Sequence, residues 1–246
     1  MMRRALVLSA LLGLLTGCAG TPDPSGVWIN QAAIDAASKS GKLREALLAY
    51  GPNLEWQIDG KDHKATFSNG FEQGEGQLSA DAQNKKRWQV AFYGSNQETL
   101  EVDGKQLVQQ GSDNWPEQRF SRPEKADPSA TAIGANFEHA LYGSYLKGTW
   151  VIKEGPGQGS KVQFLADGRL DGMPGADRYA LCLAGDCAAM TGDNDSIWLQ
   201  QGQQGREYLF DRDGDKLELF EAVNHAQVDE MPQYAPGNRV WSLERD

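Results

Sequence analysis

Histidines and clustered carboxylates are the side chains with which this sequence could bind metals or transfer protons. The three histidines, His63, His139 and His225, lie far apart, and no two have the His-x-x-x-His spacing of a metal pair on one helix face. The run Asp211-x-Asp213-Gly214-Asp215 begins like a calcium loop, but Lys216 stands where that loop needs glycine and Ala222 where it needs glutamate. Nucleophile-elbow, P-loop and dinucleotide-binding glycine patterns are absent from the sequence. The sequence therefore predicts no catalysis, no metal site and no cofactor.

The N-terminus has the features of an export signal. Arg3 and Arg4 precede residues 5–15, an almost uninterrupted apolar stretch. This stretch is too short to cross a bilayer as a helix and has the length of a signal-peptide core. We therefore expect residues 1–17 to be a signal peptide that is removed on export.

The apolar stretch ends in the motif Leu15-Thr16-Gly17-Cys18, which resembles the lipobox of bacterial lipoproteins. The resemblance implies that Cys18 is acylated and becomes the first residue of the mature chain. Ala19 follows it, rather than the Asp that retains such proteins at the inner membrane, so the resemblance implies an outer-membrane anchor facing the periplasm. The alternative is an ordinary secretory signal with a chance cysteine. Residues 18–25 contain two prolines and no large apolar side chain, and we expect them to form a short tether.

Cys182 and Cys187 are the two remaining cysteines, and four residues that include Gly185 separate them. In an oxidising compartment such a pair is expected to form a disulfide that clips a hairpin. The spacing differs from the Cys-x-x-Cys of redox enzymes, so we interpret the pair as structural.

Length and charge limit the class of protein. The chain has 246 residues, which suits one large domain or two small ones. Its 24 basic and 34 acidic residues give a net charge of −10, and removal of residues 1–17 leaves 22 basic residues and a charge of −12. This acid excess argues against a nucleic-acid partner, because phosphate binding needs clustered Lys and Arg. With 28 glycines and ten prolines, the chain favours an all-β architecture rich in turns.

Two similar units follow one another in the mature chain. Gly-x-Trp opens each unit at residues 26–28 and 148–150, and an aromatic residue followed by arginine closes it at Arg122 and Arg245. The tryptophan and the arginine are 94 positions apart in the first unit and 95 in the second. Two internal motifs also match, residues 64–67 with 161–164 and residues 100–104 with 209–214. Matches in the same order at nearly equal spacing predict a duplicated domain.

Apolar and polar residues alternate through most of each unit, as at residues 54–58 and 217–219, which indicates β-strands with one face on a core. Two segments break this pattern. Residues 31–50 have apolar side chains at helical spacing and predict one amphipathic helix or two short ones. Residues 130–145 predict a helix that precedes the second unit.

A Gly-x-Trp first strand, a run of short strands and an arginine near the last strand together resemble the lipocalin-like, or calycin, family. The resemblance implies that Arg122 packs across Trp28, and Arg245 across Trp150, to close one end of each barrel. A guanidinium over an indole face contributes about 0.5–2 kcal/mol. The implied fold is all-β, with two tandem small antiparallel lipocalin-like β-barrels and short helical insertions.

Five parts are expected along the chain: a signal peptide over 1–17, a lipidated tether over 18–25, barrel 1 over 26–123 with a helical insertion near 31–50, a linker and helix over 124–146, and barrel 2 over 147–246. If the barrels are separate domains, we expect residues 144–246 to fold alone. Residues 164–198 also resemble META-type bacterial lipoprotein domains, which is the competing assignment for the second unit.

The remaining candidates for a functional site are the aromatic residues, of which the sequence has seven Trp, seven Tyr and eight Phe. Most are expected to fill the barrels, although an eight-stranded barrel can hold one small ligand. The lining of such a site is expected to be Trp56, Phe67, Trp88 and Phe92. The calycin resemblance implies a small hydrophobic ligand, whereas filled barrels favour contact with another envelope component, and a META-like enzyme is a third class. In each case the membrane is an expected partner through lipidated Cys18.

Overall fold

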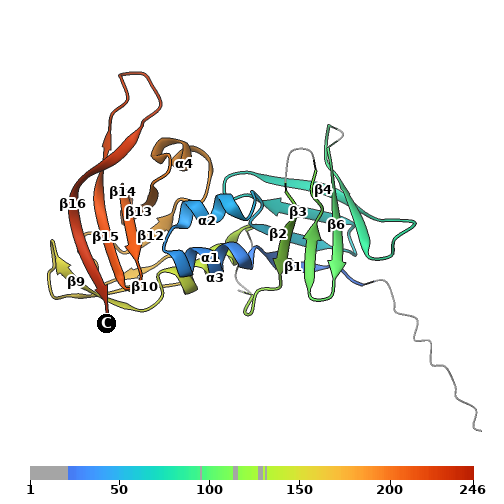
Figure 1. The fold of residues 1–246 in the computed structure, drawn as a ribbon, viewed down its shortest axis with the longest axis horizontal. Coiled ribbons are helices and arrows are strands. Elements are labelled where there is room, and N and C mark those ends of the chain that lie inside the picture. Colours follow the sequence, from blue (N-terminus) through green and yellow to red (C-terminus); the bar gives the residue numbers. More distant parts are fainter. Residues whose placement is uncertain (1–21, 95, 113–115, 127–129, 131) are drawn as a thin grey trace, which may run out of the picture.

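The computed structural model describes residues 22–94, 96–112, 116–126, 130 and 132–246. Two eight-stranded antiparallel sheets lie side by side with three short helices between them (Figure 1). The predicted all-β class with two barrel-like sheets in tandem is therefore confirmed. The signal peptide and Cys18 lie outside the described residues.

The first sheet, barrel 1, consists of β1 (Gly26–Ile29), β2 (Glu55–Asp59), β3 (Lys64–Ser68), β4 (Gln73–Ala80), β5 (Arg87–Ala91), β6 (Gln97–Asp103), β7 (Gln106–Gln109) and β8 (Gln118–Ser121). Each strand pairs with the next in sequence, and β1 pairs with β8 through Ile29 and Ser121. The sheet is therefore a closed up-and-down barrel.

The second sheet, barrel 2, consists of β9 (Thr149–Glu154), β10 (Lys161–Phe164), β11 (Leu170–Asp171), β12 (Arg178–Leu181), β13 (Asp195–Gln201), β14 (Gln204–Asp213), β15 (Lys216–Asn224) and β16 (Tyr234–Arg245). Its order runs from β11 through β10, β9, β16, β15, β14 and β13 to β12. A single bridge between Arg169 and Arg178 joins the two edges, so barrel 2 repeats the strand order of barrel 1.

In this common order the strands β1 to β8 correspond in turn to β9 to β16. Residues 100–104 and 209–214 match on that basis, because they lie at the ends of the sixth strands, β6 and β14. Residues 64–67 lie in the third strand of barrel 1, whereas residues 161–164 form the second strand of barrel 2. The predicted match is therefore wrong by one strand. An apolar strand followed by an Asn-Gly or Asp-Gly turn can occur at any hairpin, so this pattern does not identify the strand.

Four helices accompany the barrels: α1 (Gln31–Ser40), α2 (Leu43–Ala49), α3 (Ala135–Tyr145) and α4 (Gly185–Thr191). The first two replace the single long helix that residues 31–50 could have formed. The Asn30 side chain accepts a hydrogen bond from Ala33 N at the start of α1, and Gly41, with φ +78, ends it. Gly41 can adopt this left-handed conformation without a Cβ penalty, so the chain turns there into α2.

The two barrels differ in how their cores end. Barrel 1 contains a separate apolar cluster, formed by Trp28, Trp56, Ile58, Ala65, Leu78, Val90, Leu100, Val102, Leu107 and Phe120. The core of barrel 2 instead continues without interruption into α1, α2 and α3, through side chains such as Ile34, Leu43, Leu47 and Leu141. The three helices therefore complete the core of barrel 2, although two of them are inserted in the sequence of barrel 1.

Candidate functional site

At one end of barrel 1, Trp28 and Arg122 make the contact that the calycin resemblance implies. The guanidinium carbon of Arg122 lies 3.7 Å from the centroid of the Trp28 ring. The Trp28 Nε1 donates a hydrogen bond to the Pro24 carbonyl at 2.7 Å. Gly26 has φ +110, and a Cβ there would lie 2.2 Å from the Arg122 guanidinium. Glycine at this position therefore allows the arginine to cross the ring.

Barrel 2 repeats this arrangement. The guanidinium carbon of Arg245 lies 4.6 Å from the Trp150 ring centroid, and the Trp150 Nε1 donates to the Leu146 carbonyl at 2.9 Å. Gly148 has φ +117. In both barrels the tryptophan thus bonds the carbonyl four residues earlier, and a glycine with positive φ precedes it by two, as expected of duplicated units.

The aromatic residues expected to line a ligand site in barrel 1 pack mainly on one another. Trp56 is fully buried, and its ring centroid lies 5.5 Å from that of Phe67 and 6.4 Å from that of Phe92. Trp88 is partly buried against the same cluster, and its Nε1 has no hydrogen-bond partner among the described residues. The pockets described below are lined by other residues. The four side chains therefore act as core in this structure.

Cys182 and Cys187 form a disulfide with their Cα atoms 5.9 Å apart. The bond does not clip a hairpin, as the sequence suggested, but joins the end of β12 to the first turn of α4. Gly185 begins that helix with φ +70, and the ring of Phe71 from barrel 1 occupies the space that a Cβ there would take. The disulfide thus holds a loop that contacts the other barrel.

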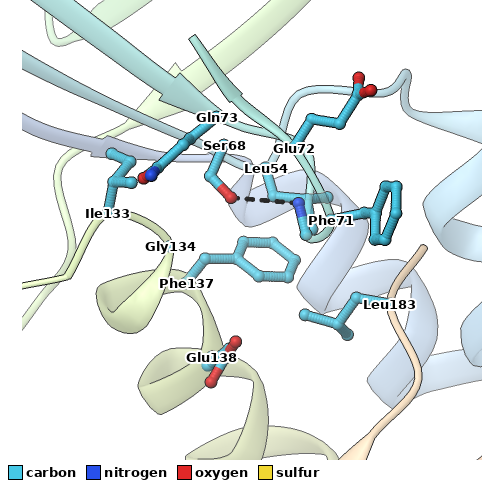
Figure 2. Close-up of a pocket in the computed structure, with 11 residues that line it drawn as sticks. Leu54, Ser68, Phe71, Glu72, Gln73, Ile133, Gly134, Phe137, Glu138 and Leu183 are labelled. Atoms are coloured by element: carbon cyan, nitrogen blue, oxygen red, sulfur yellow. Dashed lines mark hydrogen bonds between the residues drawn. The ribbon is translucent and has the colours of Figure 1, made fainter. Parts of the chain in front are cut away.

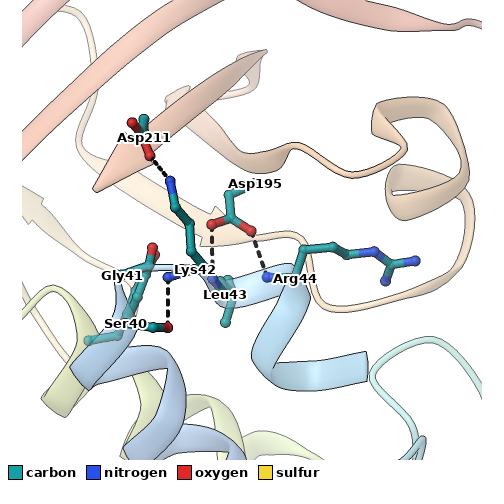
Figure 3. Close-up of polar contacts among 8 residues, drawn as sticks. Ser40, Gly41, Lys42, Leu43, Arg44, Asp195 and Asp211 are labelled. Carbon is teal, nitrogen blue, oxygen red and sulfur yellow. Dashed lines mark hydrogen bonds and ion pairs between the residues drawn. The ribbon is translucent and has the colours of Figure 1, made fainter. Parts of the chain in front are cut away.

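Asp195, at the start of β13, holds the N-terminus of α2 against barrel 2 (Figure 3). Its two carboxylate oxygens accept hydrogen bonds from Leu43 N at 2.9 Å and Arg44 N at 2.6 Å. No side chain of α2 itself caps that end, so the opposite barrel supplies the cap. Lys42 pairs with Asp211 beside it, and this hydrogen bond raises the pKa of Lys42.

Glu55 of β2, in barrel 1, caps the N-terminus of α3, the helix that precedes barrel 2. Its carboxylate accepts a hydrogen bond from Phe137 N at 2.8 Å and another from the Asn136 side chain at 3.4 Å. Gly134, the residue before α3, offers no side-chain cap. Each barrel therefore caps a helix that the sequence attaches to, or places just before, the other barrel.

A pocket of about 210 Å³ lies between barrel 1, α3 and the loop at Leu183 (Figure 2). Phe137 and Leu54 line its inner side, and the turn between β3 and β4 lines its rim. The volume is below the ~300 Å³ at which ligand pockets usually begin, so the pocket favours packing or water over a bound molecule.

We expect Glu55→Gln to flatten the acid-side pH dependence of stability. Burial raises the pKa of Glu55 despite the hydrogen bonds it accepts. The folded state therefore keeps this proton to a higher pH than the unfolded chain, and the free energy of unfolding falls as pH rises from the ordinary value of 4.5 through the raised one. Urea denaturation at several pH values measures this slope. Glu72→Gln, an exposed glutamate on the same pocket, is the control, and a slope that Glu55→Gln leaves unchanged would contradict the assignment.

The opposite end of barrel 2, away from the helices, has an open pocket of about 270 Å³. Tyr208 and Trp241 meet edge to face in it with ring centroids 5.3 Å apart, and the Arg206 guanidinium lies 5.4 Å from the Tyr208 centroid. Gly205 forms part of the wall, and Trp198, 42% exposed, lies against its backbone. We call this the open end of barrel 2.

The hairpin between β15 and β16 projects at the same end of barrel 2 (Figure 1). Val228 is 90% exposed and Met231 is 58% exposed at its tip. The Asn224 side chain accepts hydrogen bonds from Ala226 N and Gln233 N across the turn. The exposed apolar side chains at the tip therefore belong to a loop whose own hydrogen bonds hold its conformation.

The residues of the open end were not singled out from the sequence as a site. In the sequence Tyr208 is a core position of an alternating strand; in the structure it is partly buried, and Trp241 beside it is only 6% exposed. Asp211, in the calcium-like run, pairs with Lys42 instead. Among the described residues no three His, Cys, Asp or Glu side chains gather as a metal site. In the same part of the chain, no helix has the length and apolarity needed to cross a membrane.

Comparison with known proteins assigns this chain to no group: no protein-family model, curated protein sequence or solved structure matches it.

Proposed function

We propose that this protein is a lipid-anchored, non-catalytic lipoprotein of the outer membrane that binds another envelope protein through the open end of barrel 2. The observation that carries the proposal is the set of exposed and partly exposed side chains around the buried Trp241: Trp198, Arg206, Tyr208, Val228 and Met231. Trp, Tyr, Met and Arg are enriched at protein interfaces, and Trp, Tyr and Arg dominate their binding energy.

The placement of the tether supports the same proposal. Strand β1, where barrel 1 begins, lies in the right half of Figure 1, and the β15–β16 hairpin lies at the upper left. A chain anchored at Cys18 therefore presents the open end of barrel 2 away from the membrane, where a periplasmic protein can reach it.

The alternative, a calycin-like carrier of a small hydrophobic molecule, has less support. Aromatic side chains occupy the interior of barrel 1, and the helices complete the core of barrel 2. The pocket at the open end of barrel 2 holds about 270 Å³, which suits an inserted side chain better than an acyl chain.

Cys18→Ser is expected to release the protein from membranes into the soluble periplasmic or secreted fraction. Acyl chains bind a bilayer by about 0.8 kcal/mol per buried methylene, and the substitution removes the atom that carries them. Fractionation of cells with an antibody to the chain measures this. Retention of the variant in the membrane fraction would contradict the lipobox interpretation.

Photo-crosslinking in cells tests the proposed partner surface. A photoreactive residue at position 228 is expected to give one discrete protein adduct, and the same residue at position 93, fully exposed on barrel 1, is expected not to. Arg206→Glu at the pocket should reduce the adduct about tenfold, since a central interface arginine contributes about 1–2 kcal/mol or more.

Arg169→Glu is the matched control, because its side chain is 60% exposed like that of Arg206 but lies at the opposite end of barrel 2. Equal adducts from positions 228 and 93, or an adduct that Arg206→Glu leaves intact, would rule out the open end as the partner site.

A further inference from the structure

Three turns of barrel 1 meet at the end from which the tether leaves. They are residues 60–63, 81–86 and 104–105, which follow β2, β4 and β6. Ser25 Oγ accepts a hydrogen bond from Gly60 N at 3.1 Å, and Val102 N donates to the Lys86 carbonyl at 2.9 Å. We call these turns, together with Arg122, the tether end of barrel 1.

The length of chain before residue 22 places this end close to the anchor. Cys18 precedes Pro22 by four residues, and four extended residues span at most ~14 Å. Pro22 and Asp23 themselves line a pocket at the tether end. If Cys18 carries lipid in the bilayer, the tether end lies within about that distance of the membrane surface.

Exposed lysines project from these turns. Lys61, Lys85, Lys86 and Lys105 are exposed, and none has an ion-pair partner within the part of the chain that the structure describes. Other basic residues of barrel 1 are paired, as Lys64 is with Glu75 and Arg87 with Glu101. Free lysines at the tether end contrast with a mature chain whose net charge is −12.

Carboxylates occur on the same turns, and two of them are bound to the backbone of their own turn. Asp59 Oδ1 accepts hydrogen bonds from the backbone of Lys61 and Asp62, and Asp81 Oδ1 accepts them from Gln83 and Asn84. Asp103 lies 3.9 Å from the Arg119 guanidinium. Asp62 is exposed beside Lys61, and Asp23 lies near Arg122, so five carboxylates match the five cations in number. Lysine and arginine side chains extend further from the backbone than these short acids and can reach a surface that the acids do not.

The pocket at the tether end has about 640 Å³ and opens to solvent. Arg122 and Lys105 supply cationic donors to it beside the carboxylate of Asp23, while Val102 and Trp28 form apolar parts of its wall. A phosphate beside a short apolar segment is the chemistry of a phospholipid headgroup and its glycerol. Arginine and lysine are also the residues that bind phosphate most strongly.

We infer that the tether end of barrel 1 is a membrane-docking face that binds anionic phospholipid, with the phosphate at Arg122 and Lys105 and the other three lysines on the surrounding surface. The inference rests on the lipid anchor of the proposed function and adds an orientation to it. Basic side chains near an anionic bilayer each favour binding, and their effect decays within a Debye length of about 10 Å, so a short tether is essential.

Amide hydrogen exchange on vesicles tests this face without cellular acylation. The mature chain is coupled through the Cys18 thiol to a maleimide lipid, since Cys182 and Cys187 are joined to each other. Vesicles rich in phosphatidylglycerol are expected to slow exchange in residues 60–63, 81–86 and 104–105 at least tenfold compared with vesicles of phosphatidylcholine alone. Residues 225–233 should exchange equally on both.

Lys85→Gln with Lys86→Gln should lose most of this protection, and high salt should remove it. Lys39→Gln with Lys147→Gln makes the same change in net charge on exposed lysines outside these turns and should retain it. Equal exchange on both vesicle types, or protection at residues 225–233 instead, would overturn the docking face. Neither result depends on whether a protein binds barrel 2.

Discussion

Residues 144–246 on their own are expected not to fold, although the duplicated sequence suggests an independent unit. The fragment lacks α1, α2 and nearly all of α3, whose apolar side chains are continuous with the core of barrel 2. Ile34, Leu43, Leu47 and Leu141 are each at least 95% buried, and burial of one such side chain contributes about 1.5–3 kcal/mol. Their sum is comparable to the 5–15 kcal/mol that holds a typical domain folded.

Circular dichroism melting and amide chemical-shift dispersion measure this outcome. Residues 22–246 serve as the control and are expected to melt cooperatively. A sharp thermal transition and dispersed amides in the short fragment would contradict the role given to the helices.

Gly41→Ala is expected to lower the free energy of unfolding by about 3 kcal/mol or more. Gly41 has φ +78, which alone costs a residue with a Cβ about 1–2 kcal/mol. The added Cβ would also lie 2.1 Å from the Arg212 carbonyl oxygen of barrel 2, so the backbone of the junction must move. That movement disturbs two contacts, the bond from Tyr145 Oη to the Gly41 carbonyl and the bond from Arg212 to the Ser38 carbonyl.

Gly175→Ala separates the two causes. Gly175 has φ +77, close to that of Gly41, but no atom lies within 4 Å of the position its Cβ would take. The control should therefore lose only the conformational part, about 1–2 kcal/mol. Urea denaturation of both variants measures the difference, and equal losses would show that the contact of Gly41 with barrel 2 contributes nothing.

The strand pattern and the Trp–Arg contacts could be predicted from the sequence because their causes are local or repeated. Alternation along residues 54–58 follows from the two-residue period of a strand with one buried face. The pairing of Trp28 with Arg122, and of Trp150 with Arg245, was implied by the calycin resemblance, whose first-strand tryptophan and closing arginine recur in both units. The Asp-Gly and Asn-Gly turns indicate hairpins but do not show which hairpin of the barrel each one forms. For this reason residues 64–67 of the third strand were matched with residues 161–164 of the second strand.

The junction could not be predicted because its causes lie far apart in the sequence. Glu55 alternates with Leu54 and Trp56 and therefore looked like a solvent-facing strand residue, yet α3 buries it 82 positions away in the chain. Asp195 ends the polar run Asp193-Asn194-Asp195, which on its own indicates a solvated loop, yet it caps a helix 151 positions earlier. Nothing within either segment encodes the partner, since the partner is brought there only by the packing of both barrels on the helices.

Helices α1, α2 and α3 are expected to join the two barrels into one cooperative unit. Amide exchange along a urea titration measures this cooperativity directly, with β6 reporting on barrel 1 and β14 on barrel 2. The expected result is that both strands lose protection at the same urea concentration and that Gly41→Ala shifts both midpoints together. Two separate midpoints, with that of β6 unchanged in Gly41→Ala, would contradict it.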